Sequence, residues 1–153
     1  MRKLGMSIAA LGLAAAGLVV PAAAAQASAT GAASNHCNDI WPGRNGKVYA
    51  YNETYCNGVL GYTAGNDADW NKAGGGFTSA SDKASSVLNA GYTGGNDTVK
   101  FYYLANYTGG YGCIGPNEYF VDNLARNTLS NGASANNNIR SHKWVSSCDN
   151  LMH

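Results

Sequence analysis

Charged residues are scarce in this sequence of 153 residues, which has 10 Lys or Arg, 9 Asp or Glu and no run of basic residues. Nucleic acids and anionic membrane surfaces are bound through clustered Lys and Arg side chains. The sequence therefore predicts no nucleic-acid partner and no electrostatic binding to a membrane.

Catalytic motifs are missing as well. The chain has 3 His and lacks a Gly-x-Ser-x-Gly elbow, a His-Glu-x-x-His pair and a glycine loop for phosphate. Paired carboxylates for glycoside hydrolysis are an alternative that we do not favour, because acidic residues between Asn and Gly usually form turns. The candidates for such a pair are Asp67, Asp69, Asp97 and Glu118. We predict that the protein is not an enzyme and requires no cofactor.

Residues 1–27 have the features of a secretory signal peptide. Arg2 and Lys3 form a charged start, an apolar run follows, and Ala-Gln-Ala at 25–27 is a typical cleavage site. Removing these two basic residues from the ten leaves eight, against nine acidic ones. We predict a secreted protein without a membrane anchor, with a flexible lead-in at 28–38 and a single domain at 39–153.

The composition of that domain indicates an all-β fold. No convincing helical period occurs after the signal peptide, whereas Gly and Tyr are frequent (20 and 10 residues in the whole chain), together with Asn, Ser and Thr. Gly and Asn supply the left-handed positions of tight turns, and Tyr packs well on the faces of sheets.

Four cysteines in a chain predicted to be exported indicate two disulfide bonds. Three pairings are possible among Cys37, Cys56, Cys113 and Cys148, and the sequence alone does not choose between them. We favour Cys37 with Cys56 and Cys113 with Cys148, because these bonds would close each half of the chain separately.

Residues 99–110, Val-Lys-Phe-Tyr-Tyr-Leu-Ala-Asn-Tyr-Thr-Gly-Gly, predict a folded hairpin. The stretch begins with the alternation of a strand and breaks it after Tyr103. Tyr102 and Tyr107 can pack under a hairpin that folds back onto its own sheet. Gly109 can take the positive φ that the return of the chain requires.

An earlier stretch of the chain has the same pattern. When the two strands are aligned, Tyr51 and Gly58 take the places of Tyr102 and Gly109, whereas Cys56 replaces the second tyrosine. Each hairpin is followed by an element that ends in Ser-Ser, and this matching order indicates an internal repeat. We expect the second copy to be longer by about ten residues.

The hairpin spacing and the repeat resemble the Greek-key pattern of the βγ-crystallin superfamily. The resemblance implies a β-sandwich of two Greek-key motifs, the first at about 46–90 and the second at about 97–148. In that superfamily a serine of the later element hydrogen-bonds the folded hairpin. The structural residues expected on this basis are Tyr51, Gly58, Ser86, Tyr102, Tyr107, Gly109 and Ser147.

The same resemblance raises the question of calcium. In the superfamily, two acidic or amide residues, two variable residues and Ser/Thr-Ser supply oxygen ligands for Ca²⁺. Residues 81–86, Ser-Asp-Lys-Ala-Ser-Ser, match this pattern except at the first position, and residues 142–147 have lost the ligands. Two interpretations stay open: a weak calcium site at Asp82 and Ser85, or serines that only bind the hairpins, which we favour.

Taken together, the signal peptide, the cysteines, the hairpins and the terminal Ser-Ser-Cys resemble the secreted actinomycete peptidase inhibitors typified by the Streptomyces metalloproteinase inhibitor. The resemblance covers about 37–148 and implies a monomer that blocks an extracellular protease, such as a thermolysin-like zinc enzyme. Such enzymes favour a bulky apolar residue after the scissile bond. Cys113 and Ile114 are therefore nominated as the reactive bond, the alternative being that Ile114 continues a core strand.

A different class of function stays open beside inhibition. A crystallin-like domain without inhibitory activity could bind calcium, or it could bind carbohydrate or cell wall through exposed aromatic side chains. The aromatic residues considered for such a platform are Trp41, Tyr62, Trp70, Tyr92 and Tyr111.

Overall fold

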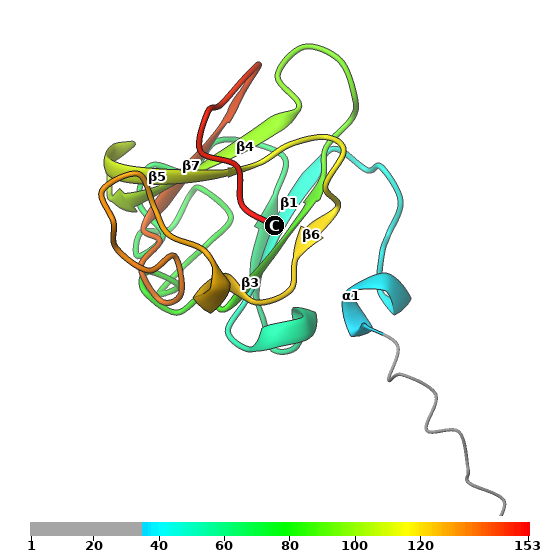
Figure 1. The fold of residues 1–153 in the computed structure, drawn as a ribbon, viewed down its shortest axis with the longest axis horizontal. Coiled ribbons are helices and arrows are strands. Elements are labelled where there is room, and N and C mark those ends of the chain that lie inside the picture. Colours follow the sequence, from blue (N-terminus) through cyan, green and yellow to red (C-terminus); the bar gives the residue numbers. More distant parts are fainter. Residues whose placement is uncertain (1–34) are drawn as a thin grey trace, which may run out of the picture. The chain divides into compact units, whose positions relative to one another are not determined.

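The computed structural model describes residues 35–153 of the chain, and the predicted signal peptide lies outside these residues. The described part is built from strands with short helical turns between them (Figure 1). The strands are β1 (Lys47–Tyr51), β2 (Val59–Thr63), β3 (Ser86–Ala90), β4 (Thr98–Leu104), β5 (Thr108–Ile114), β6 (Phe120–Val121) and β7 (Ser141–Val145). The helical turns are α1 (His36–Asp39), η1 (Thr54–Cys56) and η2 (Leu124–Arg126).

The strands form two antiparallel sheets. One sheet has four strands in the order β2-β1-β3-β6, and the other has three strands in the order β5-β4-β7. In each sheet a hairpin supplies two neighbouring strands, β1 with β2 and β4 with β5. The returning strand of each motif lies on the other side of the first strand, β3 beside β1 and β7 beside β4.

The third strand of each motif joins the sheet of the other motif. β6 follows the second hairpin in the chain, yet it pairs with β3 of the first motif, with Val87 opposite Val121. In the opposite direction, Asp67 follows the first hairpin and forms an antiparallel bridge with His142 in β7. This connectivity is that of two Greek keys. The predicted β-sandwich of two Greek-key motifs is therefore confirmed.

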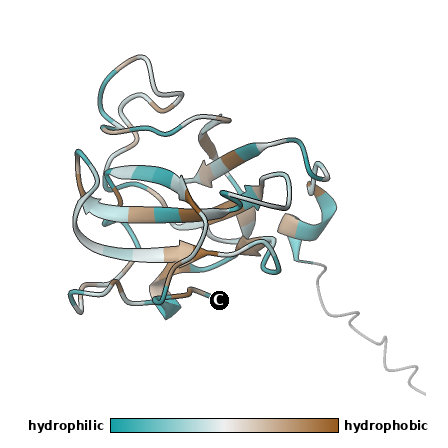
Figure 2. Ribbon diagram, turned by 90° about the horizontal axis from the view of Figure 1, so that it is seen from above, coloured by the Kyte–Doolittle hydropathy of each residue, from teal (hydrophilic) through white to brown (hydrophobic). Residues whose placement is uncertain are grey.

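The main core lies between the sheets and takes alternate residues from their strands. Val48 of β1 and Phe101 of β4 belong to it and are 0% exposed. Trp70 and Phe77, from the connection between β2 and β3, stack in the same core with ring centroids 4.4 Å apart. Figure 2 shows the corresponding alternation of apolar and hydrophilic positions along the strands.

A second apolar cluster covers the outer face of the four-stranded sheet. Tyr51 and Leu88 point to this side and pack in one cluster with Cys37, while Trp41 contacts its edge. Residues 35–38, which we expected in a flexible lead-in, therefore belong to the folded domain, because Cys37 is 0% exposed and disulfide-bonded.

Candidate functional site

Both predicted hairpins contain residues in the left-handed region of backbone conformation. A non-glycine residue is strained there, so other contacts must stabilise it. The strained residues, with φ of 58° or 59°, are Tyr55, Cys56, Asn106 and Tyr107. Each hairpin then continues through a glycine of positive φ, Gly58 at 65° and Gly109 at 79°, at the positions that the spacing predicted.

A serine of β3 binds the first hairpin. The Ser86 hydroxyl donates a hydrogen bond to the carbonyl of Glu53 at 2.6 Å and accepts one from the amide of Cys56 at 3.0 Å. Ser86 is 0% exposed, so both bonds are shielded from water. The two contacts link the turned tip of the hairpin to the returning strand of the same motif.

In the second motif the corresponding residue is Ser141 and not Ser147, so our assignment of Ser147 was wrong. The Ser141 hydroxyl donates to the carbonyl of Leu104 at 2.6 Å and accepts from the amide of Tyr107 at 3.1 Å. Ser147 is exposed and lies beyond the end of β7.

The strand pairing gives the physical reason for this error. Ser86 lies opposite Tyr51 and Ser141 lies opposite Tyr102, so the sequence separations are 35 and 39 residues. The second copy is thus longer by four residues between these points, not by about ten. A repeated Ser-Ser pair is a weaker guide than the strand register, because only one serine per motif reaches its hairpin.

Substitution of these serines tests the assignment. Ser141→Ala leaves a partly buried amide and carbonyl without their partner, so we expect the free energy of unfolding to fall by about 1–2 kcal/mol. Ser86→Ala should behave alike, whereas Ser147→Ala should change stability by less than about 0.5 kcal/mol. Urea denaturation of the three variants measures this, and a larger loss for Ser147→Ala than for Ser141→Ala would contradict the assignment.

The two disulfide bonds follow the favoured pairing. Cys37 is bonded to Cys56 and Cys113 to Cys148, and the partners are 19 and 35 positions apart in the sequence. Bonds that close loops of this size stabilise a protein by about 3–4 kcal/mol each. The first bond attaches α1 to the tip of the first hairpin, and both are compatible with an extracellular environment.

The nominated reactive bond is not presented to solvent. Cys113 and Ile114 are each 0% exposed, and Ile114 belongs to the main core. The Cys113 amide donates to the carbonyl of Asn150 at 2.9 Å, and its carbonyl accepts from the amide of Met152 at 2.8 Å. A protease cleft cannot reach this bond without unfolding β5, so the nomination was wrong and the core-strand alternative is correct.

The calcium-like elements of the two motifs meet in the folded domain. The second element is residues 136–141, Asn-Asn-Asn-Ile-Arg-Ser, rather than 142–147. Asp82 and Asn137 occupy the same place in the two elements, with φ of 57° and 56°. The Asp82 amide donates to the carbonyl of Ile139 at 3.0 Å, and the Asn137 amide donates to Ala84 at 2.8 Å.

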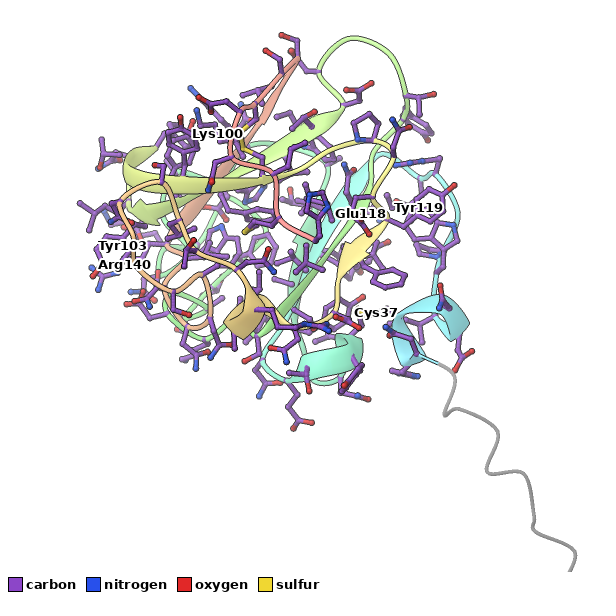
Figure 3. The ribbon with its side chains drawn as sticks, in the orientation of Figure 1. Cys37, Lys100, Tyr103, Glu118, Tyr119 and Arg140 are labelled. Carbon is purple, nitrogen blue, oxygen red and sulfur yellow. A yellow bond between two sulfur atoms is a disulfide. The ribbon has the colours of Figure 1, made fainter. Side chains whose placement is uncertain are left out.

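Because each of these elements pairs with the element of the other motif, Asp82 and Ser85 lie in two separate half-sites. Asp82 faces Arg140, whose Nε lies 3.0 Å and 2.8 Å from its two carboxylate oxygens, with Nη2 at 2.8 Å from Oδ2. Ser85 instead faces Asn137, with 3.5 Å between its hydroxyl and the amide oxygen. Figure 3 shows Arg140 beside Tyr103 on this side of the molecule. The Arg140 guanidinium is therefore ion-paired with the carboxylate that a calcium ion would need as a ligand. The other half-site offers only the neutral side-chain oxygens of Ser85 and Asn137.

The acidic side chains considered for catalysis have structural partners. The Asp67 carboxylate accepts hydrogen bonds from the amides of Asp69 at 3.0 Å and Phe77 at 3.1 Å. Asp97 accepts from the amide of Gly94 at 2.8 Å. Within residues 35–153, no group of three or more His, Cys, Asp or Glu side chains could hold a metal ion.

His142 lies in the core and not at a surface site. Its Nδ1 accepts a hydrogen bond from Trp70 Nε1 at 2.9 Å, and its Nε2 lies 3.1 Å from the carbonyl of Gly65. These partners fit a neutral ring with the proton on Nε2. Burial lowers the pKa of His142 to about 4, although the carbonyl of Gly65 acts in the opposite direction.

The connection between β3 and β4 is the most accessible loop of the domain. Residues 92–96 are exposed without interruption, the longest such run within residues 35–153. Tyr92 is 66% exposed and its ring lies against Gly46, where an added Cβ would come within 2.7 Å of the ring. In Figure 1 the loop projects, in light green, beyond the ends of the strands.

Buried polar contacts hold the base of this loop. The side-chain amide of Asn89, a residue that is 0% exposed, donates to the carbonyl of Asp97 at 2.9 Å and accepts from the amide of Gly91 at 2.9 Å. Arg44 donates to the carbonyls of Asn89 at 3.0 Å and Gly91 at 3.2 Å. Neither Asn89 nor Arg44 was predicted as a site residue, because an Asn in a strand and a lone Arg carry no local signal of this role.

Three features define a βγ-crystallin-like domain. They are the third strands exchanged between the motifs, the hairpins with residues in the left-handed region, and the two serines that bind these hairpins. No family model matches the chain, and no curated protein matches it. A solved structure described as "Evolution of the eye lens beta-gamma-crystallin domain fold" is similar, at 22% identity and a TM-score of 0.48, over 71% of this chain and 91% of that one.

Two further solved structures show the same likeness. A βγ-crystallin from Ciona intestinalis is 18% identical with a TM-score of 0.45, over 65% of this chain and 99% of that chain. A βγ-crystallin from an archaeon is 23% identical with a TM-score of 0.43, over 65% and 96% of the two chains. These likenesses concern the fold alone, and the fold assignment rests on the topology described above.

The helical segments of the domain are all short. None of those within residues 35–153 has the length and apolar character that crossing a bilayer requires.

Proposed function

We propose that the protein is a secreted peptidase inhibitor that acts through the loop at 91–97, without catalytic activity of its own. The observation that supports this proposal is the combination of an exposed run at 92–96 with a buried, hydrogen-bonded base at Asn89. An inhibitor loop that is already ordered loses little conformational entropy on binding, which lowers the cost of association.

Tyr92 is the proposed anchor of the contact. Among residues 35–153 it is the most exposed of the large hydrophobic side chains, at 66%, and tyrosine is enriched among residues that dominate binding energy. A bulky side chain at the start of the loop also fits the resemblance to inhibitors of thermolysin-like proteases. These proteases favour a bulky apolar residue after the scissile bond. We propose that a monomer binds the protease and that calcium is not needed for binding.

Inhibition of thermolysin by the purified, oxidised protein tests the proposal. We expect saturable inhibition with about one inhibitor per protease, and we expect Tyr92→Ala to weaken it about 30-fold, as loss of a 2 kcal/mol anchor would. Tyr55→Ala is the matched control, because Tyr55 is 46% exposed on the first hairpin, away from this loop in the sequence.

Two results would count against the proposal. Absence of inhibition of thermolysin, subtilisin and trypsin would remove the inhibitor function. Equal weakening by Tyr92→Ala and Tyr55→Ala would keep inhibition but remove the loop as its contact. Far-UV and near-UV circular dichroism of each variant confirms that the fold is retained.

A further inference from the structure

The outer face of the three-stranded sheet carries two lysines side by side. Lys100 of β4 lies directly opposite Lys143 of β7 in the antiparallel register. Like charges at opposite positions of neighbouring strands destabilise a sheet. Among residues 35–153, no carboxylate lies within ion-pair distance of either ammonium, whereas Lys72, Arg126 and Arg140 each have an acidic partner.

Tyrosine rings surround this pair of charges. Lys100 Nζ lies 3.4 Å from the centroid of the Tyr111 ring and 5.7 Å from that of Tyr102. Lys143 Nζ lies 5.8 Å from the Tyr102 centroid and 5.7 Å from that of Tyr107. Tyr102 is 6.0 Å from Tyr107 and 6.3 Å from Tyr111 between centroids, so the three rings form a row across the face.

A hollow adjoins this row at the end of the sheet. It has a volume of about 480 Å³ and is lined by Lys100, Tyr111, Ser147, Cys148 and Asp149. Asp149 accepts a hydrogen bond from the Tyr111 hydroxyl at 2.8 Å, and this bond, together with the nearby Lys100, keeps the pKa of Asp149 below its usual value. The face therefore presents two cations against one carboxylate that already has a partner. Figure 3 shows Lys100 on this sheet.

We propose that this face, formed by Lys100, Lys143, Tyr102, Tyr107 and Tyr111, binds a polysaccharide that carries carboxylate groups, such as a polyuronate. Two adjacent ammonium groups complement carboxylates on a polymer, and binding relieves their mutual repulsion. The half-buried rings of Tyr107 and Tyr111 contact the pyranose rings and their hydroxyl groups, whereas Tyr102, which is 6% exposed, lies between these two rings and supports them. An open face suits an extended polymer better than a small ligand, which prefers an enclosed pocket.

This site does not include the loop at 91–97, because its residues lie on β4, β5 and β7, in the turn between β4 and β5, and in the segment that follows β7. Binding of a polyuronate could therefore localise the protein without occupying the proposed protease contact. Loss of thermolysin inhibition would not affect the proposal, and loss of polyuronate binding would not affect the inhibitor function.

Affinity electrophoresis of the full mature protein in gels containing polygalacturonate tests the proposal. We expect retardation that weakens with added salt, and a loss of at least about tenfold in affinity for the variant Lys100→Gln/Lys143→Gln. The matched control is Lys47→Gln/Lys83→Gln, which removes the same charge from β1 and from the segment before β3 and should bind as the wild type does. Because the first variant removes a repulsive pair, its melting temperature should not fall by more than a few degrees.

Three outcomes would overturn the proposal. The first is no retardation by polygalacturonate at low salt. The second is an equal loss of affinity in both double variants, which would indicate a dependence on net charge alone. The third is equal binding of polyglutamate, a polyanion without sugar rings, which would assign the face to acidic peptides instead. Neutral dextran should not retard the protein.

Discussion

Lowering the pH from 7 to 4.5 is expected to reduce the free energy of unfolding by about 2–3 kcal/mol, mainly through His142. In the folded protein, burial lowers the pKa of His142 from 6.5 to about 4, so the ring stays neutral. In the unfolded chain the ring takes up a proton near pH 6.5. The unfolded state therefore binds more protons in this interval, and stability that is fully present above pH 6.5 is lost as the pH falls towards 4.

The variant His142→Gln separates this contribution from others. Glutamine does not titrate, and its side chain can still accept from Trp70 and donate to the carbonyl of Gly65, the two partners of the histidine. We expect the variant to be less stable at pH 7 and to lose little further stability down to pH 4.5.

Urea denaturation at several pH values gives the measurement, and His153→Gln is the control, because the His153 side chain is 71% exposed. Asp69 and Asp149 have lowered pKa values, so the stability linked to them is lost as the pH falls from the ordinary carboxyl pKa of 3.8 towards the lowered one, which is below the interval from pH 7 to 4.5. An unchanged pH dependence in His142→Gln would show that the ring is not held neutral.

Replacement of Arg140 by serine is expected to create a response to calcium that the natural protein lacks. The guanidinium of Arg140 is ion-paired with the Asp82 carboxylate. The substitution frees this carboxylate and places the hydroxyl of the new serine beside it, and both groups are oxygen ligands for Ca²⁺. Without calcium the variant should lose at most about 1 kcal/mol, because the ion pair is partly exposed. At a calcium concentration one hundred times the Kd, binding adds about 2.7 kcal/mol, or roughly 10 °C in Tm.

Differential scanning calorimetry with and without millimolar Ca²⁺ measures this effect. The natural protein should show no change in Tm, and the double variant Arg140→Ser/Asp82→Ala should lose the response, which assigns it to the carboxylate. A rise in Tm of the natural protein with calcium would contradict the role given to Arg140. Failure of Arg140→Ser to respond would show that the surrounding carbonyls do not complete a site.

The hairpins could be predicted because their causes are local, whereas the sequence only favoured one of three possible disulfide pairings. A glycine at 109 and the tyrosines at 102 and 107 have a spacing that few other structures require, and the earlier copy with Gly58 supports the same conclusion. The cysteine pairing followed from the choice to close each half of the chain separately, which the structure confirms.

The errors concern residues whose roles depend on register between distant strands. Ser147 was chosen for its local Ser-Ser context, but strand pairing places Ser141 opposite Tyr102 and so at the hairpin. Ile114 was chosen because it follows a cysteine and precedes a turn, a context that resembles an exposed reactive loop. It is core because the chain end at 150–152 pairs with β5 and covers Cys113.

The sequence by itself therefore determined the two folded hairpins, since their pattern depends on residue type and short spacing, and through the resemblance it predicted the class of fold. It favoured one disulfide pairing without excluding the other two. Only the tertiary structure decided which serine binds the second hairpin, that Arg140 is ion-paired with Asp82, and that Lys100 and Lys143 lie side by side. These three depend on the pairing of segments about 35–60 residues apart, and such pairing is set by how both sheets bury their apolar faces together.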